Sequence, residues 1–246
     1  MNPPRKTVLV TGSSSGIGFE VARSFLEAGW NVVLNGRDAE RLRHAVDALG
    51  KPDRSAAVAG STPDRATGDA MVAVAQQRFG GLDALVNNAG EFGKKAFLDV
   101  TEQELDHYIA VNLKGTYLTT QAAVRALVAQ GRGGSIVNIG TVLASHGMSW
   151  VQGSAPLVCK GGIHALTIAL AAELASHGIR VNCVAPGFTR TPLMEGANEA
   201  ALAATALLGR VADVHDVAAA VRYLTDAAFV TGQFVNVDGG YVSGRR

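Results

Sequence analysis

The sequence predicts a doubly wound α/β fold, in which helices cover both faces of a parallel sheet. Three observations predict it: a glycine-rich turn between the first predicted strand and helix, regular alternation of strands with helices, and strands that read as near-continuous apolar runs. Such runs are typical of strands buried on both faces. With 246 residues, 48% of them hydrophobic, the chain is long enough for one domain spanning residues 1–246.

The first predicted strand and helix flank the glycine-rich turn. The strand is Val8-Leu9-Val10, and the helical pattern runs from Phe19 to Leu26. Between them Gly12, Gly16 and Gly18 follow the spacing G-x-x-x-G-x-G. Glycine at these points permits a sharp turn, close approach of a ligand and close packing of helix on strand. The free N–H groups at the helix start suit a pyrophosphate, and the absence of a G-K-[ST] motif disfavours a nucleoside triphosphate.

Capping and turn signals place the remaining elements. Asp38 caps a helix that ends at Gly50, and Thr101 with Glu104 forms a capping box that opens a helix reaching Val128. Further helices are expected to end near residue 79 and to run from about residue 155 to 176, with strands at 31–35, 56–59, 84–87, 135–139, 180–184 and 233–237. No linker or repeat interrupts this alternation, which favours a single domain.

The composition argues against several classes of function. A net charge of +1 gives no electrostatic reason to bind nucleic acid or a membrane surface. Two cysteines, Cys159 and Cys183, imply no disulfide framework, and the histidines show no metal-ligand spacing. The first residues carry no apolar signal segment, and the longest uncharged stretch, 133–159, contains several polar residues. We therefore expect a soluble cytoplasmic protein without a metal site.

Unusual residues gather after the strands, at the carboxyl edge where parallel sheets bind ligands. They are the glycine turn after the first strand, Arg37 after the second, residues 88–90 after the fourth, Thr141 after the fifth and Pro186-Gly187 after the sixth. The sequence therefore predicts one site at this edge.

Several short motifs follow one another along the chain: Thr11-Gly12-x-x-x-Gly16-Ile17-Gly18, Asn87-Asn88-Ala89-Gly90, Val111-Asn112-Leu113-Lys114-Gly115, Lys160-Gly161-Gly162, Pro186-Gly187 with Thr191, and Val237-Asp238-Gly239-Gly240. In this order and spacing the chain resembles the short-chain dehydrogenase/reductase family over nearly its whole length. The resemblance implies a Rossmann-type sheet of seven parallel strands and a nicotinamide cofactor.

The same resemblance implies the residues of the site. The cofactor would be held by Gly12, Ser14, Ser15, Gly16, Ile17, Gly18, Arg37, Asn88, Ala89, Gly90, Lys160, Pro186, Gly187, Thr189 and Thr191. The catalytic residues would be Asn112, Thr141 and Lys160, with a small carbonyl compound or alcohol as substrate. The family also pairs its long helices between copies, which implies a homo-oligomer, a tetramer or a dimer.

The chain departs from the family at the proton donor. Members carry Y-x-x-x-K, in which an ammonium one turn away lowers the pKa of a phenol that is ordinarily near ~10. Here Pro156 stands four residues before Lys160, and Thr141 takes the serine position. The stretch from Thr141 to Pro156 is also about two residues longer than usual. Proline suits the first turn of a helix, with Ser154 or Ala155 as its cap, but it cannot donate a proton.

Five other side chains could supply the missing acid: His146, Ser149, Ser154, Cys159 and Tyr108. His146 titrates in the right range and follows the fifth strand. Cys159 neighbours Lys160, but adjacent helix residues point apart, which favours a packed thiol. Tyr108 shares a helix face with Asn112 and is expected in the core. The sequence alone leaves the donor open.

The end of the second strand favours NADP(H), with NAD(H) as the alternative. NAD calls for a carboxylate at this point to bind the adenosine ribose hydroxyls, whereas this chain has Asn35-Gly36-Arg37. The Arg37 guanidinium could bind a 2′-phosphate in a bidentate manner. The alternative is a solvated arginine that pairs with Asp38 or Glu40.

Three functions follow as hypotheses. The first is an NADP(H)-dependent oxidoreductase with a non-standard proton donor and a small apolar or aromatic substrate. Its pocket would be lined by Phe92, Leu143, Met148, Trp150 and the segment Leu193–Leu208. The second is a degenerate member that binds the dinucleotide or a partner subunit without turnover. The third is an enzyme for a reaction that needs no phenol.

Overall fold

The computed structural model describes residues 5–244; the two ends of the predicted 1–246 domain, including the first four residues of the segment inspected for a signal, lie outside the described residues. Seven parallel strands form one sheet in the order β3-β2-β1-β4-β5-β6-β7. The strands are β1 (Thr7–Val10), β2 (Asn31–Gly36), β3 (Ser55–Ala59), β4 (Ala84–Asn87), β5 (Gly134–Ile139), β6 (Ile179–Pro186) and β7 (Phe234–Val237). The predicted doubly wound sheet is confirmed.

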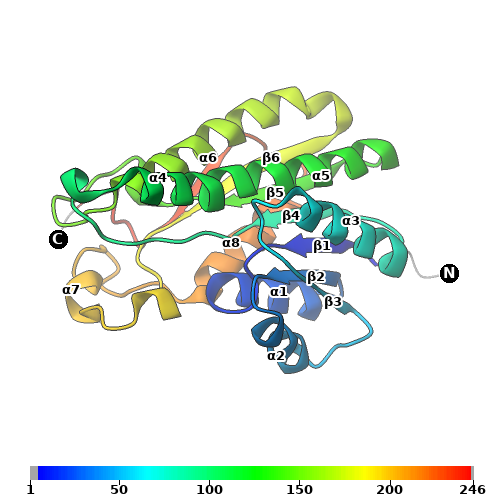
Figure 1. The fold of residues 1–246 in the computed structure, drawn as a ribbon, viewed down its shortest axis with the longest axis horizontal. Coiled ribbons are helices and arrows are strands. Elements are labelled where there is room, and N and C mark those ends of the chain that lie inside the picture. The colour runs from blue at the N-terminus through cyan, green and yellow to red at the C-terminus, as the bar shows by residue number, and fades with distance from the viewer. Residues whose placement is uncertain (1–4, 245–246) are drawn as a thin grey trace.

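Helices cover both faces of this sheet, as Figure 1 shows. They are α1 (Gly16–Glu27), α2 (Ala39–Leu49), α3 (Arg65–Phe79), α4 (Glu102–Tyr108), α5 (Gly115–Gln130), α6 (Ser154–Glu173), α7 (Glu199–Ala203) and α8 (Val214–Asp226). Val8 and Val10 pack into the core beneath α1 and α8, whereas Leu9 packs into the opposite core beneath α3 and α5. Because successive strand side chains point to opposite faces, the apolar run of β1 fills both cores.

The predicted helix from Glu102 to Val128 is three elements. A π-helix, Ile109–Lys114, separates α4 from α5 and contains the fully buried Asn112. Wide turns of this kind occur mostly as short interruptions of α-helices, frequently at functional sites. The capping box of Thr101 and Glu104 is confirmed at the start of α4.

The cap expected at the start of α6 is wrong: Gly153, not Ser154 or Ala155, precedes the helix. Pro156 is then the third helical residue. The first i→i−4 bond runs from the Leu157 N–H to the Gly153 carbonyl over 3.0 Å, so the missing N–H of proline costs no helical hydrogen bond.

By length and composition α6 could cross a membrane. In the fold α6 packs against β6 and the π-helix instead, and its side chains Cys159, Ile163 and Thr167 are buried. The core beneath it accounts for part of its apolar character, and Val158 and Ile168 remain exposed.

Candidate active site

The glycine turn after β1 is hydrogen-bonded to the chain after β4. The Thr11 hydroxyl accepts from the N–H groups of Asn88 and Ala89, each over 3.0 Å. The Asn88 amide donates to the carbonyls of Thr11 and Gly12 over 3.0 and 2.9 Å. A Cβ on Gly18 would overlap the Gly12 carbonyl and the Asn88 amide, and Gly12 has a φ of +61°. Glycine is therefore required for the turn and for close packing of α1.

The N-terminus of α1 opens toward the same edge. Ser15 occupies the cap position, but its side chain caps no helical N–H, and no acidic residue lies in the first turn. Thr191 and Pro192 lie over the turn, where a Cβ added to Gly16 would sit 3.6 Å from Thr191. Unpaired N–H groups at a helix start favour an anionic ligand, so this turn suits a pyrophosphate.

Lys160, Asn112 and Gly90 converge beside the turn. The Lys160 ammonium donates to the Ile139 carbonyl at the end of β5 over 2.6 Å. A Cβ on Gly90 would lie 3.4 Å from Lys160 Nζ and 3.2 Å from Asn112 Oδ1. Burial lowers the pKa of Lys160. The backbone carbonyl of Asn112 accepts a hydrogen bond from the Thr116 hydroxyl over 3.0 Å.

Thr141 lies between the carboxyl ends of β5 and β6. Its hydroxyl is 3.4 Å from the Pro186 carbonyl and accepts from the Leu143 N–H over 3.3 Å. The buried Thr189 donates to the Gly187 carbonyl over 3.2 Å. The predicted residues after these two strands therefore lie together, and both hydrogen bonds of Thr141 are long.

Sequence reasoning misses Glu91 and His107. Arg37 pairs with Glu91 over 2.6 Å, so the alternative of pairing with Asp38 or Glu40 is wrong. The other Glu91 oxygen lies 2.7 Å from His107 Nε2. Burial acts to raise the pKa of Glu91, but the His107 hydrogen bond and the Arg37 charge outweigh it and lower that pKa. No sequence spacing joins residues this far apart, and only the fold brings them together.

Arg41 is a second cation that sequence reasoning misses. It lies in the first turn of α2, and its Nη2 is 3.5 Å from the Ser15 hydroxyl. Ser14, Ser15 and Arg41 line one open cavity of about 330 Å³. Arg37 and Arg41 together place two guanidinium groups near the end of β2.

Pro156 lines a cavity of about 90 Å³ together with Tyr108 and Ser154. A Cβ on Gly93 would overlap the Tyr108 hydroxyl, so glycine leaves room for the phenol. Tyr108 precedes Asn112 by one turn, as Pro156 precedes Lys160, and α4 packs against α6. The expectation that Tyr108 belongs to the core is wrong: the side chain is half-buried and faces this cavity.

The other candidate acids lie elsewhere. Cys159 is buried, and burial raises the pKa of its thiol, as expected for a packed cysteine. His146 packs edge-on against Tyr241 with ring centroids 5.2 Å apart. Ser149 is exposed. Over residues 5–244, no three His, Cys, Asp or Glu side chains are grouped as metal ligands.

Aromatic side chains from separate loops meet near the end of β6. Trp150 stacks on Phe188 with centroids 5.7 Å apart and an angle of 17° between the rings, and Phe188 contacts the edge of Tyr241. Phe188 and Tyr241 were not predicted for this pocket, because nothing in the sequence shows that the loops meet. Leu193 and Leu208, which bound the predicted pocket segment, are largely exposed.

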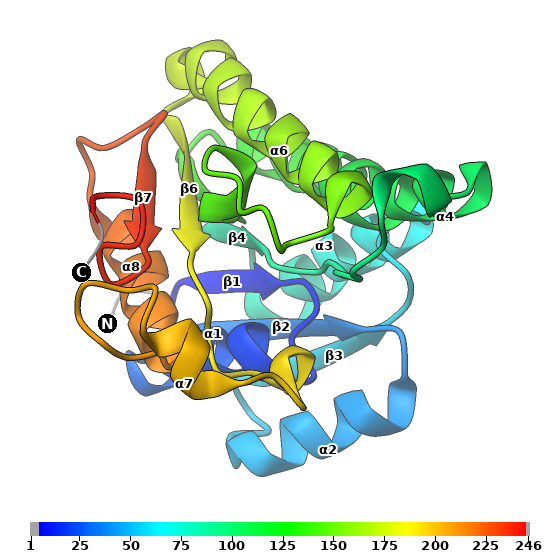
Figure 2. The ribbon, with the colours of Figure 1, turned by 90° about the vertical axis from the view of Figure 1, so that its left-hand side faces the viewer.

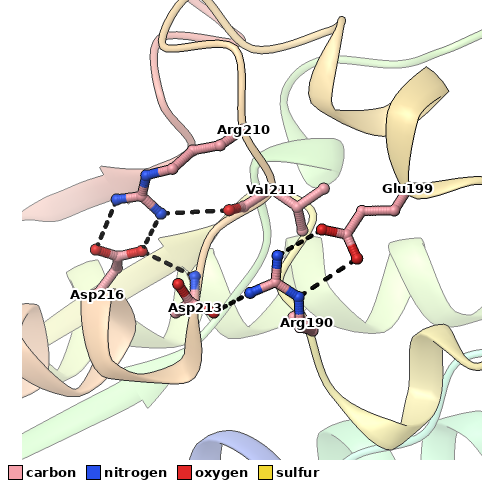
Figure 3. Close-up of polar contacts among 6 residues, drawn as sticks. All are labelled: Arg190, Glu199, Arg210, Val211, Asp213 and Asp216. Atoms are coloured by element: carbon pink, nitrogen blue, oxygen red, sulfur yellow. Dashed lines mark hydrogen bonds and ion pairs between the residues drawn. The ribbon is translucent and has the colours of Figure 1, made fainter.

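The segment that carries α7 lies beyond the carboxyl ends of β6 and β7 (Figure 2). Figure 3 shows what fixes its two ends: Arg190 binds both Glu199 and Asp213, and Arg210 binds Asp216. Two backbone hydrogen bonds reinforce this connection: the Arg190 N–H donates to the Ala212 carbonyl over 2.8 Å, and the Ala212 N–H donates to the Phe188 carbonyl over 2.9 Å. The segment over the site is therefore anchored to the start of α8.

Comparison with known proteins agrees with this geometry. Residues 12–242 match a family model described as enoyl-(acyl carrier protein) reductase. The (2S)-[(R)-hydroxy(phenyl)methyl]succinyl-CoA dehydrogenase subunit BbsD of Thauera aromatica is 38% identical over 251 residues, with 98% of both chains covered. The 3-oxoacyl-[acyl-carrier-protein] reductase FabG of Thermotoga maritima is 36% identical, covering 96% of this chain and 98% of that protein.

A solved structure shows the same fold. The crystal structure of a short-chain type dehydrogenase/reductase from Mycobacterium marinum superposes with a TM-score of 0.91 at 33% identity. The match covers 97% of this chain and 96% of the other.

Proposed function

This chain belongs to the short-chain dehydrogenase/reductase family and is an oxidoreductase acting on a carbonyl or alcohol by hydride transfer, and on that premise we propose that it is NADP(H)-dependent with a non-standard proton donor. The observation that carries the proposal is the convergence of Lys160, Asn112 and Gly90 beside the glycine turn. Its localisation is proposed to be cytoplasmic.

The residues present fit a nicotinamide dinucleotide. The open first turn of α1 and the tight glycine turn form a cradle for a pyrophosphate. The cofactor, when bound, supplies or accepts the hydride. The residues that would hold it are Gly12, Ser14, Ser15, Gly16, Ile17, Gly18, Arg37, Asn88, Ala89, Gly90, Lys160, Pro186, Gly187, Thr189 and Thr191.

The preference for NADP(H) rests on charge at the end of β2. Asn35 and Gly36 offer no carboxylate to ribose hydroxyls, whereas Arg37 and Arg41 bring two guanidinium groups to this point. A guanidinium binds phosphate oxygens through two parallel N–H groups, which a ribose hydroxyl cannot match.

Three side chains carry the proposed chemistry. Lys160 binds ribose hydroxyls through its ammonium and raises the positive potential near the substrate oxygen. Thr141 positions that oxygen by a hydrogen bond, exchanging its long contact with the Pro186 carbonyl. Asn112 fixes the chain after β4 through its side-chain amide and would hold a water next to Lys160.

For the proton donor we propose Tyr108. In the family pattern a phenol stands at position 156, where this chain has proline. The Tyr108 hydroxyl faces the cavity that Pro156 lines, and one helical turn from it lies Asn112. Lys95 lines the same cavity and pairs with Glu104 over 2.7 Å, so an ammonium lies within the same small space as the phenol.

The proposed substrate is a small apolar or aromatic carbonyl compound. The stacked Trp150 and Phe188 give the carboxyl edge a flat apolar surface. BbsD, by its name, acts on a compound with a phenyl group, which agrees with such a surface.

Two measurements test this proposal. The first follows NADPH consumption by absorbance with a panel of ketones, aldehydes and acyl thioesters. The second is a titration of NADPH binding. Turnover of one substrate class with NADPH is the expected result. NADPH binding without turnover of any compound would instead favour the degenerate, binding-only member. Failure to bind either dinucleotide would overturn the proposal.

A further inference from the structure

The Arg37–Glu91 ion pair spans the crevice at the carboxyl edge. Arg37 follows β2, and Glu91 belongs to the chain that follows β4. In the sheet β1 lies between these two strands (Figure 2). Two strand spacings amount to roughly 10 Å. The pair therefore bridges the end of β1, on the same edge of the sheet as the glycine turn that would take the dinucleotide.

Glu91 is the fixed partner of this pair. Asn112 binds its backbone N–H and carbonyl over 2.7 and 2.8 Å, and His107 binds one carboxylate oxygen. The Glu91 side chain is 31% exposed, whereas that of Arg37 is 61% exposed. Arg37 is therefore the side of the pair that moves when a phosphate competes for it.

We propose that Glu91 determines cofactor specificity by competing with the 2′-phosphate for the Arg37 guanidinium. This inference rests on the proposed binding of NADP(H) at this edge of the sheet. A dinucleotide without the phosphate leaves the ion pair in place. NADPH must displace the carboxylate from Arg37 and then bind with that carboxylate nearby, where the two negative charges repel. Glu91 therefore weakens NADPH binding selectively, and Arg41, bound to Ser15 and not to Glu91, keeps part of the phosphate affinity.

The variant Glu91→Gln tests this in the full chain. Glutamine keeps the length and the hydrogen bonding to His107 but removes the charge. We expect the Kd for NADPH to fall by about three- to tenfold and the Kd for NADH to change by less than about twofold, as measured by quenching of protein fluorescence. The matched control is Glu27→Gln, which breaks an exposed glutamate–arginine pair with Arg23 on α1 and should leave both constants unchanged.

A double-variant cycle shows whether the effect passes through Arg37. In an Arg37→Ala background, Glu91→Gln should lower the Kd for NADPH by less than about twofold. A folded Glu91→Gln protein with unchanged or weaker NADPH binding overturns the inference but leaves the proposed preference standing. Wild-type protein that prefers NADH, with a selective NADPH gain in Glu91→Gln, overturns the preference and supports the inference. Failure of both cofactors to bind wild-type protein overturns both.

Discussion

Asn112 holds Glu91 by both of its backbone hydrogen-bonding groups. Its Oδ1 accepts from the Glu91 N–H over 2.7 Å, and its Nδ2 donates to the Glu91 carbonyl over 2.8 Å. Asn112 is fully buried in the π-helix. This helix therefore fixes the chain after β4, which reaches toward Lys160 and Arg37. One amide thus links the proposed catalytic lysine to the proposed cofactor-specificity pair.

Asn112→Leu should therefore destabilise the fold as well as the site. It leaves the Glu91 N–H and carbonyl without partners, each at a cost of about 1–3 kcal/mol. Urea unfolding followed by circular dichroism should show a total loss of about 2–6 kcal/mol in the free energy of unfolding. The control Asn236→Leu, at an exposed position in β7, should change stability by less than about 0.5 kcal/mol. Equal midpoints for Asn112→Leu and wild type would contradict the role of this amide.

The sequence predicts the parts of this arrangement that are local. The β1 turn with its glycines, the Asp38 cap and the Thr101–Glu104 box are each encoded within a few residues, and the structure confirms them. A π-helix has no comparable signal, because the apolar pattern of residues 102–128 is compatible with an uninterrupted helix.

Contacts between distant segments could not be predicted. The Arg37–Glu91 pair and the Trp150–Phe188 stack join loops whose approach depends on strand order. The Tyr108 orientation depends on how α4 packs against α6. Residue type and spacing showed that Pro156 lacks a donor group, but only the fold shows which phenol shares its cavity.

Arg37→Ala should weaken NADPH binding by about tenfold and NADH binding by less than about twofold. The loss is at the lower end for a charge-assisted contact because Arg37 is mostly exposed and must leave Glu91. Arg41→Ala should show the same selectivity with a smaller loss of about two- to fivefold. Calorimetric titration with both cofactors measures these constants. Equal losses for NADPH and NADH would show that neither arginine reads the 2′-phosphate.

Tyr108→Phe should lower the rate of ketone reduction by at least about a hundredfold while leaving the Kd for NADPH unchanged. The substitution removes one hydroxyl and keeps the ring that packs in the cavity. Ser154→Ala, at the same cavity, should retain the rate within about threefold. Loss of activity in His146→Ala instead would place the donor at His146.

The chain should form a homo-oligomer, a tetramer or a dimer. Apolar surface is exposed by Phe97 just before α4, Leu105 on α4, Ile109 in the π-helix and Tyr117 on α5, and also by Val158 and Ile168 on α6. Surfaces of this kind are usually covered by a partner, and the family pairs the corresponding helices between copies. Light scattering at micromolar concentration should give a mass of two or four chains. Ile168→Glu should lower that mass, and a monomeric wild-type protein would contradict the prediction.

Pro156→Tyr should raise reductase activity on an activated ketone. Pro156 lies in the first turn of α6, where no hydrogen bond depends on its ring, so tyrosine should cost little stability. Its phenol would stand one turn before Lys160, whose ammonium lowers a phenol pKa, and a cavity of about 90 Å³ adjoins it. A positioned acid contributes about a hundred- to ten-thousand-fold, so the gain should be largest in the Tyr108→Phe background, where the native donor is absent.

The double variant Tyr108→Phe/Pro156→Tyr shows whether position 156 still faces the substrate, even where Pro156→Tyr alone leaves the rate unchanged. If Pro156→Tyr restores the rate of Tyr108→Phe, position 156 still faces the substrate, and a phenol at either place can serve. If both variants fold and bind NADPH but the double variant stays as slow as Tyr108→Phe, the additional residues between Thr141 and Pro156 have moved the pocket away from α6. The family geometry then does not transfer to this position, and Tyr108 alone supplies the proton.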